Sequence, residues 1–157
     1  MTVYGRILVA GAGSAALLIA AFAFQYLGGL APCELCVWQR WPHALAAVIS
    51  VLAITVLWRQ HRALAALGGA TMLAGAGLAG FHAGVEQGWW EGFSACAAPA
   101  PGDLSPPELL ARIREAPLVR CDEIAWQMLG VSMAGWNALA SLCLAGVWLW
   151  SARRPAA

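Results

Sequence analysis

The stretch ILVAGAGSAALLIAAFAFQYLGGLAPC, from Ile7 to Cys33, contains no Asp, Glu, Lys or Arg. A membrane-spanning helix needs about 20 mostly apolar residues in a row, and this stretch is longer than that. The whole chain has 157 residues, of which 61% are hydrophobic and only 11% are charged. Soluble domains usually carry about 25% charged residues. The sequence therefore predicts an integral membrane protein with one domain over residues 1–157.

Three further stretches have no charged residue and are long enough to span a membrane: Trp41–Trp58, Ala63–Val85 and Ile124–Ala152. Backbone polar groups cannot be satisfied by lipid, so apolar stretches of this kind form helices. We therefore expect an all-α membrane protein, a bundle of four transmembrane helices. The predicted spans are approximately 7–30, 41–58, 63–84 and 130–151, with outward loops at approximately 31–40 and 85–129.

The arginines indicate the orientation in the membrane. Arginines without acidic neighbours stand before the first span, in the turn between the second and third, and after the fourth: Arg6, Arg59, Arg62, Arg153 and Arg154. All eight acidic residues lie on the other side. Because short cytoplasmic segments are enriched in Lys and Arg, both termini are predicted to be cytoplasmic. No cluster of basic residues suggests binding to nucleic acid.

Four of the five cysteines fall in the two outward loops. Cys33 and Cys36 lie in the first loop, and Cys96 and Cys121 lie in the second. Cys143 lies inside the last apolar stretch, where we expect a small core side chain. The orientation derived from the arginines places the loop cysteines in an oxidising compartment, where disulfides persist.

The two cysteine pairs invite different interpretations. A Cys96–Cys121 bridge closes a long loop and, taken alone, fits a structural staple. A Cys33–Cys36 bridge closes a very small ring and removes little chain entropy, whereas Cys-x-x-Cys is typical of exchanging disulfides with lowered thiol pKa. The alternative is half of a zinc site, with the second pair supplying two more ligands. The absence of a second Cys-x-x-Cys favours redox chemistry, and no metal ligand set is predicted.

Local signals suggest how the loops are built. Pro42 fits the first turn of a helix, so the second helix is predicted to start near Trp38, just after Cys36. A helix N-terminus and the nearby charge of Arg40 would both favour a Cys36 thiolate. The segment LSPPELLARIREAPLV, from residue 104 to 119, has a capping box and predicts a short amphipathic helix on the membrane surface.

Two other groups of side chains complete the prediction. Gln25 and Asn137 are expected to form hydrogen bonds between helices. Tryptophans at the ends of the predicted spans, Trp148 among them, are expected to anchor the protein at the membrane interface.

The segment PCELCVWQR, Pro32–Arg40, resembles the Pro-Cys-x-x-Cys-x-x-x-Arg stretch of the disulfide bond formation protein DsbB family. The second cysteine pair in a long outer loop and the segment LGVSMAGWNALAS, Leu129–Ser141, are similar to that family as well. The resemblance covers nearly the whole chain. It departs from the family in Pro42 and His43 after Arg40 and in the compact long loop.

The resemblance implies a thiol oxidase of the bacterial inner membrane. Such an enzyme reoxidises a periplasmic DsbA-like protein with a thioredoxin fold and passes the electrons to a membrane quinone, ubiquinone before menaquinone. Cys96 would form the mixed disulfide with the partner. Cys121 would be the mate of Cys96 and then the target of Cys33, and Cys36 would be the thiolate that meets the quinone.

The resemblance further implies that Arg40 supports the quinone site, and His82 matches a position on the quinone side of the third span. Three alternatives stay open. One is a metal- or haem-handling membrane protein that uses the outward cysteines with His43 or His82. Another is a structural membrane protein whose long loop is stapled. The third is a protein like vitamin K epoxide reductase, in which the Cys-x-x-Cys pair lies within a late helix rather than before the second.

Overall fold

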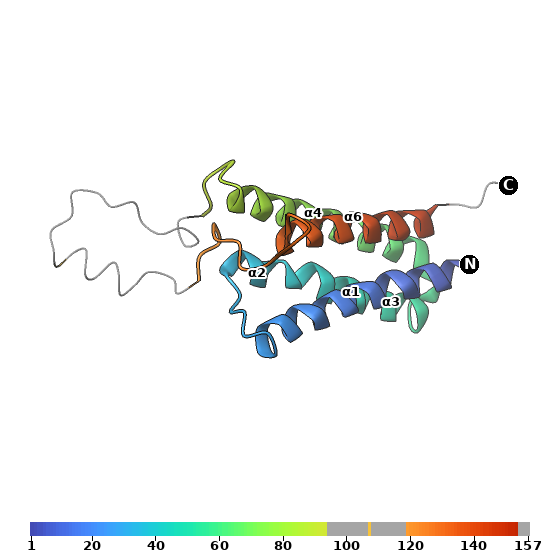
Figure 1. The fold of residues 1–157 in the computed structure, drawn as a ribbon. Coiled ribbons are helices and arrows are strands. Elements are labelled where there is room, and N and C mark those ends of the chain that lie inside the picture. Colours follow the sequence, from blue (N-terminus) through green and yellow to red (C-terminus); the bar gives the residue numbers. More distant parts are fainter. Residues whose placement is uncertain (94–106, 108–118, 154–157) are drawn as a thin grey trace.

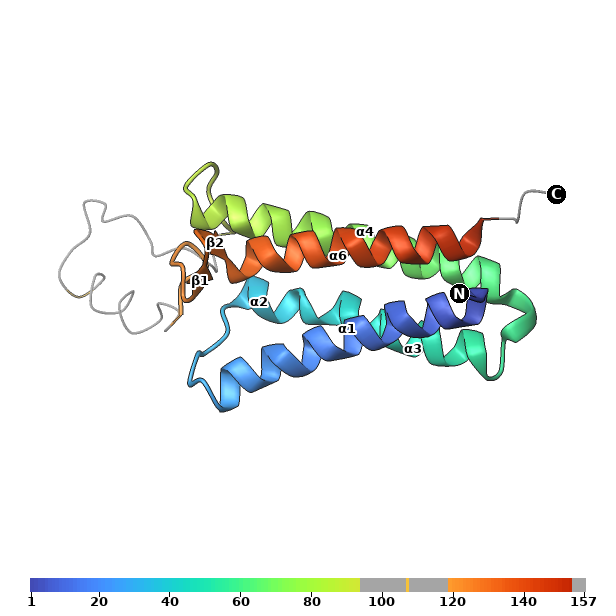
Figure 2. The same cartoon turned by 45° about the vertical axis from the view of Figure 1, so that its right-hand side comes forward.

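The computed structural model describes residues 1–93, 107 and 119–153. Within them, four long helices run side by side (Figures 1 and 2), namely α1 (Val3–Tyr26), α3 (Arg40–Ile54), α4 (His61–Glu86) and α6 (Met133–Ala152). Cys96 and the predicted surface helix lie outside the described residues.

The two ends of the bundle differ in what they carry. The start of α1, the end of α6 and the 3-10 turn η1 (Trp58–Gln60) lie together at one end, as Figure 2 shows. The short helix α2 (Glu34–Trp38) and a two-stranded sheet lie at the opposite end. Cys33 and Cys36 therefore lie at the opposite end of the bundle from the elements that carry Arg6, Arg59 and Arg153.

The sheet is a tight hairpin that leads into α6. Strand β1 (Gln127–Met128) pairs antiparallel with β2 (Val131–Ser132). The two residues between them, Leu129 and Gly130, have φ angles of 54° and 76°, the left-handed pair that a two-residue hairpin turn requires. Ser132 then caps α6, because its hydroxyl accepts the main-chain N–H of Gly135.

Three helices of the described chain are long and apolar enough to cross a membrane: Val3–Tyr26, Trp58–Glu86 and Met133–Ala152. The chain is therefore mostly helical and has the helices of a membrane protein. The second predicted span corresponds to α3, which has only 15 residues and is shorter than the length usually needed.

Small residues let the helices approach closely in the core. A Cβ on Gly11 of α1 would lie 2.2 Å from the Cβ of Ser50 on α3, and a Cβ on Gly68 of α4 would lie 2.6 Å from the Trp148 ring on α6. Trp148 is 0% exposed, so the prediction that it anchors the protein at the membrane interface is wrong. Its ring packs in the core because Gly68 has no side chain to fill that space. The prediction for Cys143 is also wrong, because its side chain lies on the exposed face of α6.

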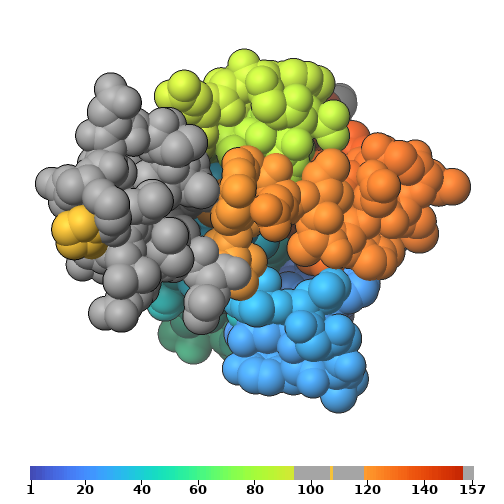
Figure 3. Space-filling model, turned by 60° about the vertical axis from the view of Figure 1, so that its left-hand side comes forward, coloured from blue at the N-terminus to red at the C-terminus, as the bar shows by residue number. Residues whose placement is uncertain are grey.

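The described part of the second outer loop covers the end of the bundle. Figure 3 shows this segment, drawn in orange, between the end of α4 and the loop that follows α1. Its Cys121 packs in a buried cluster with Cys33, Leu35 and Val85. Residues from both outer loops therefore share one small core at this end.

Candidate active site

Cys33 is the N-cap residue of the short helix α2. Its backbone is extended, and its sulfur accepts the main-chain N–H of Cys36 at 3.2 Å. The long helix α3 starts at Arg40, two residues after the predicted start near Trp38. The sequence prediction missed the separate helix α2, which starts at Glu34 because the Cys33 sulfur satisfies a free N–H. The expectation for Pro42 is confirmed, since it lies in the first turn of α3.

The two thiols of this pair differ in acidity. The Cys33 thiol donates a hydrogen bond to the Cys36 sulfur over 2.8 Å, and this bond lowers the pKa of Cys36. The charge of Arg40 lowers that pKa further, while burial and Glu86 oppose the shift. The same hydrogen bond, followed by burial, raises the pKa of Cys33. The reduced pair therefore holds its proton on Cys33 and its negative charge on Cys36, which is also the more accessible of the two.

Cys121 reaches the pair from the second outer loop. Its side chain is fully buried, and its sulfur, the Cys33 sulfur and a ring nitrogen of His82 all lie within 4.8 Å of one another. Disulfide exchange proceeds when one thiolate attacks a neighbouring disulfide sulfur. The structure therefore brings together two sulfurs that lie far apart in the sequence, in a position suited to exchange.

Arg40 is held against α1. Its Nη1 donates a hydrogen bond to Gln25 Oε1 at 2.7 Å, and its guanidinium lies 4.7 Å from the centre of the Phe22 ring. The predicted interhelical hydrogen bond of Gln25 is confirmed. These contacts fix the arginine at the cavity that Cys36 also lines.

A buried polar network joins three helices behind the cysteines. His82 on α4 contacts Cys33 and Gln39, and Asn137 on α6 contacts Gln39 and His43. The interhelical role predicted for Asn137 is confirmed. Sequence reasoning missed Gln39, because nothing in its position before Arg40 marks it as buried.

The sequence analysis also did not identify Glu86 as a residue of the site. It lies one helical turn after His82 on α4, and its Oε1 is 4.0 Å from the His82 Nε2. The Ser132 hydroxyl donates a hydrogen bond to its other oxygen, Oε2. The hairpin that leads into α6 is thereby tied to the end of α4.

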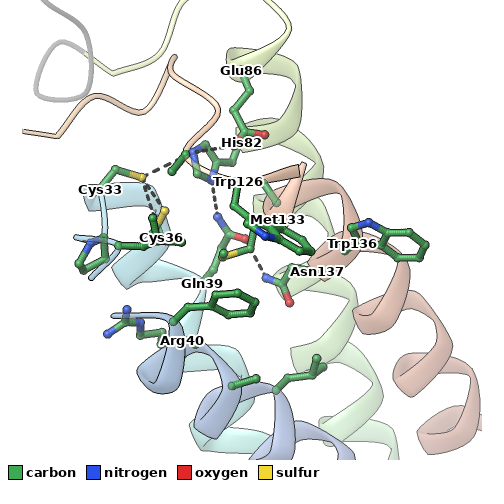
Figure 4. A pocket seen from close by; sticks show the side chains of 18 of the residues that line it. Cys33, Cys36, Gln39, Arg40, His82, Glu86, Trp126, Met133, Trp136 and Asn137 are labelled. Carbon is green, nitrogen blue, oxygen red and sulfur yellow. Dashed lines mark hydrogen bonds and ion pairs between the residues drawn. The ribbon is translucent and has the colours of Figure 1, made fainter. Parts of the chain in front are cut away.

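A cavity of about 400 Å³ opens beside the cysteines. Most of its walls are apolar side chains from α1, from the start of α6 and from the segment just before β1. Figure 4 shows Met133 and Trp136 of α6, and Trp126 before β1, among them. Its polar lining includes Cys33, Cys36 and Arg40. Cavities of about 300–1,000 Å³ with apolar walls and a few polar groups are typical of small-molecule sites.

Several known proteins have sequences similar to this chain. The profile of the family described as disulfide bond formation protein DsbB matches residues 5–151. The disulfide bond formation protein B of Methylococcus capsulatus is 34% identical over 157 residues, covering 89% of this chain and 90% of that protein. The disulfide bond formation protein B 2 of Pseudomonas entomophila is 33% identical over 139 residues, covering 85% and 81%.

An uncharacterised protein of Rickettsia prowazekii is 28% identical over 129 residues, covering 81% of this chain and 74% of that protein. No solved structure shows significant similarity to the chain. The family profile covers nearly the whole length, including both described cysteine segments. The chain therefore belongs to the disulfide bond formation protein DsbB family, as a membrane oxidoreductase that generates disulfides.

Proposed function

We propose that this protein oxidises a periplasmic DsbA-like dithiol protein and passes the electrons to a membrane quinone. One observation carries the proposal. The Cys121 sulfur lies within 4.8 Å of the Cys33 sulfur, and Cys33 and Cys36 line an apolar cavity. A disulfide relay that ends at a lipid-soluble acceptor needs both of these features in one place.

The thiol chemistry follows from the positions of the sulfurs. The partner protein would reduce the Cys96–Cys121 disulfide through a mixed disulfide at Cys96. Exchange between Cys121 and Cys33 then forms a bond between these two sulfurs as the Cys33–Cys36 bond breaks, and Cys36 leaves as a thiolate. Attack of Cys96 on Cys121 would then re-form the Cys96–Cys121 bond and release Cys33, so that both electrons from the partner's thiols lie on the Cys33–Cys36 pair that lines the cavity. Before that last step, Cys36 is already a thiolate while Cys33 is still bonded to Cys121.

Arg40 is the group that stabilises Cys36 at this stage. While Cys33 is bonded to Cys121, it has no S–H to donate, so the hydrogen bond that lowers the pKa of Cys36 is lost. The charge of Arg40 remains, because a guanidinium stays protonated at any working pH. Arg40 thus becomes the main positive group beside the thiolate.

The cavity fits a quinone. Its volume of about 400 Å³ and its apolar walls suit a substituted ring with an isoprenoid tail. Gln25 takes only one N–H of the Arg40 guanidinium, and further N–H groups can donate to a ring oxygen. When bound, the quinone accepts two electrons and two protons. Cys36 and Arg40 would hold the negative charge and the hydrogen-bond donors beside it.

The proposed setting is the bacterial inner membrane, with both termini cytoplasmic and the cysteines periplasmic. The elements at the ends of the bundle support this orientation, since the arginine-bearing ends and turn lie opposite α2. We propose α3 as the fourth span, with α2 continuing from its outer end at the membrane surface. The two helices are separated only by Gln39, which itself has helical backbone angles.

A metal site is the second candidate function, because Cys33, Cys121 and His82 offer three clustered ligand atoms. Thiolates and a histidine are the ligands that zinc prefers. Metal analysis of the purified protein distinguishes the two functions. Stoichiometric zinc or haem iron would favour a metal-handling protein.

The decisive assay is thiol-dependent quinone reduction by the purified full-length protein. A reduced thioredoxin-like protein serves as the electron donor and a soluble ubiquinone analogue as the acceptor. We expect quinone reduction that requires the donor and disappears in Cys36→Ser. The matched control is Cys143→Ser, which should keep the wild-type rate because Cys143 lies on the exposed face of α6. No reduction by the wild-type protein would overturn the proposal.

A further inference from the structure

A chain of four hydrogen bonds runs from the Cys33 sulfur into the bundle. His82 Nε2 lies 3.5 Å from Cys33 Sγ, and His82 Nδ1 lies 2.7 Å from Gln39 Nε2. Asn137 Nδ2 donates to Gln39 Oε1 at 2.7 Å, and Asn137 Oδ1 lies 2.8 Å from His43 Nε2. Figure 4 shows the first three of these contacts converging behind the cysteine pair. The two histidines and the glutamine are each at most 6% exposed.

One main-chain carbonyl fixes the direction of the whole chain. Gln39 Nε2 also donates to the Leu35 carbonyl at 3.2 Å, and a carbonyl can only accept. The Gln39 amide nitrogen must therefore face Leu35 and His82, and its oxygen must face Asn137. The Asn137 amide is oriented in turn, so that its oxygen accepts the Nε2–H of His43.

This direction determines the tautomer of His82. Its Nδ1 faces an N–H donor, so Nδ1 must be the acceptor. A neutral imidazole has one acceptor and one donor nitrogen, so the proton is on Nε2. That nitrogen is the one beside the Cys33 sulfur. The ring therefore presents an N–H to the Cys33 sulfur and to the main chain of Cys121 beside it, and has no free lone pair there.

The same geometry opposes a metal at the three clustered ligand atoms. A histidine that binds a metal through Nε2 needs its proton on Nδ1, and it usually donates that N–H to a carboxylate or carbonyl. Here an amide N–H of Gln39 points at Nδ1, in the place where a carboxylate or carbonyl acceptor would be needed. Metal binding would bring two N–H groups against each other, although the thiol positions alone suit zinc.

We propose that Gln39 and Asn137 are positioning residues that hold His82 in the Nε2–H tautomer. In this form His82 donates to the Cys33 sulfur and neither takes the proton of Cys33 nor binds a metal ion. The reduced cysteines are thereby kept available for exchange instead of being captured by thiophilic cations. This use rests on the proposed thiol oxidase function, whereas the tautomer itself does not.

The tautomer can be measured directly. The reduced full-length protein in detergent micelles, labelled with ¹⁵N-histidine, has only three histidines to resolve, and His82→Asn assigns the relevant signals. Long-range ¹H–¹⁵N correlations should show the proton of His82 on Nε2. Gln39→Leu, which removes the N–H that faces His82 Nδ1, should give a mixture of tautomers. Asn137→Leu should give a smaller change, because the Leu35 carbonyl still holds the Gln39 amide. A wild-type proton on Nδ1, or an unchanged spectrum in Gln39→Leu, would overturn the proposal.

A second measurement uses Zn²⁺ as the probe under anaerobic, reducing conditions. Gln39→Glu replaces the opposing N–H by an acceptor, and such supporting groups change metal affinity by about 10–100-fold. We therefore expect Gln39→Glu to bind Zn²⁺ about 10–100-fold more tightly than wild type. Gln39→Leu, which only removes the donor, should show a smaller gain.

The gain in affinity must depend on the cluster itself. Adding Cys121→Ser to Gln39→Glu should abolish it, since Cys121 is one of the three ligands. Equal Zn²⁺ affinity of wild type, Gln39→Glu and Gln39→Leu would contradict the proposal. Neither measurement needs quinone or partner protein, so failure here is distinguishable from failure of the oxidase function.

Discussion

Replacing Arg40 by methionine should impair the use of quinone while leaving the exchange between cysteines intact. Methionine keeps most of the side-chain volume but removes the positive charge beside Cys36 and the hydrogen bond to Gln25 Oε1. The loss matters most after Cys33 has formed its bond to Cys121, because the thiol hydrogen bond to Cys36 is then absent. The variant should fold, since Arg40 lies at the edge of the cavity and not in the core cluster.

The expected size of the effect is that of one charge-assisted hydrogen bond, the one proposed from Arg40 to the bound quinone. Such a bond contributes about 1.5–3 kcal/mol, and each 1.36 kcal/mol corresponds to a factor of about ten in rate. Arg40→Met should therefore weaken quinone use by about ten- to a hundred-fold. Arg40→Lys should recover only part of the loss, because an ammonium lacks the planar fork of the guanidinium.

The assay is steady-state quinone reduction across a quinone titration, alongside trapping of the partner as a mixed disulfide. Gln25→Leu is the matched variant, because it frees the guanidinium but keeps its charge. We expect a smaller loss in Gln25→Leu than in Arg40→Met, and normal trapping in both. Wild-type quinone kinetics in Arg40→Met would refute the reasoning and leave Arg40 as an anchor to Gln25 and Phe22.

Three further predictions concern the thiols, the packing and the orientation. Cys33→Ala removes the main cause of the lowered Cys36 pKa, so the midpoint of Cys36 alkylation should move to higher pH, and an unchanged midpoint would disprove the hydrogen-bond account. Gly68→Ala would place a Cβ 2.6 Å from the buried Trp148 ring and should destabilise the protein by about 1–3 kcal/mol in thermal unfolding. Gly77→Ala on the same helix meets nothing within 4 Å and should leave stability equal or higher. A membrane-impermeant thiol reagent should label reduced Cys36 in intact cells, and labelling only after inner-membrane permeabilisation would reverse the proposed orientation.

The sequence was sufficient to predict the features that depend on local composition. Uncharged stretches mark the long helices, because lipid leaves a buried chain few alternatives. The sequence did not reveal that α2 and α3 are separate, since the break depends on the Cys33 sulfur capping a helix five residues long. Side-chain capping by cysteine has no strong signature in a sequence.

The packing of the bundle was also beyond the sequence. Trp148 and Cys143 both lie in an apolar stretch, and hydrophobicity alone cannot tell a lipid-facing side chain from a core one. Trp148 of α6 is buried because Gly68 of α4 leaves room for its ring.

The active site also contains some residues that the sequence identifies and some contacts that it does not. Cys33, Cys36 and Arg40 could be recognised because their spacing is local. The contacts of Gln39 with His82 and Asn137 join residues 43 and 98 positions apart, so they depend on how α4 and α6 pack. Predicting such a network requires the arrangement of the helices first.

The most direct test of the proposed relay is to trap the bond between the two outer loops. In Cys36→Ser, the Cys33 sulfur has lost its mate in α2, and Cys121 lies within 4.8 Å of it. Oxidation of the purified variant, followed by peptide mapping, should reveal a Cys33–Cys121 disulfide in most molecules. A Cys33 thiol that stays free after oxidation, with Cys121 bonded only to Cys96, would contradict the relay from the second loop to the cavity.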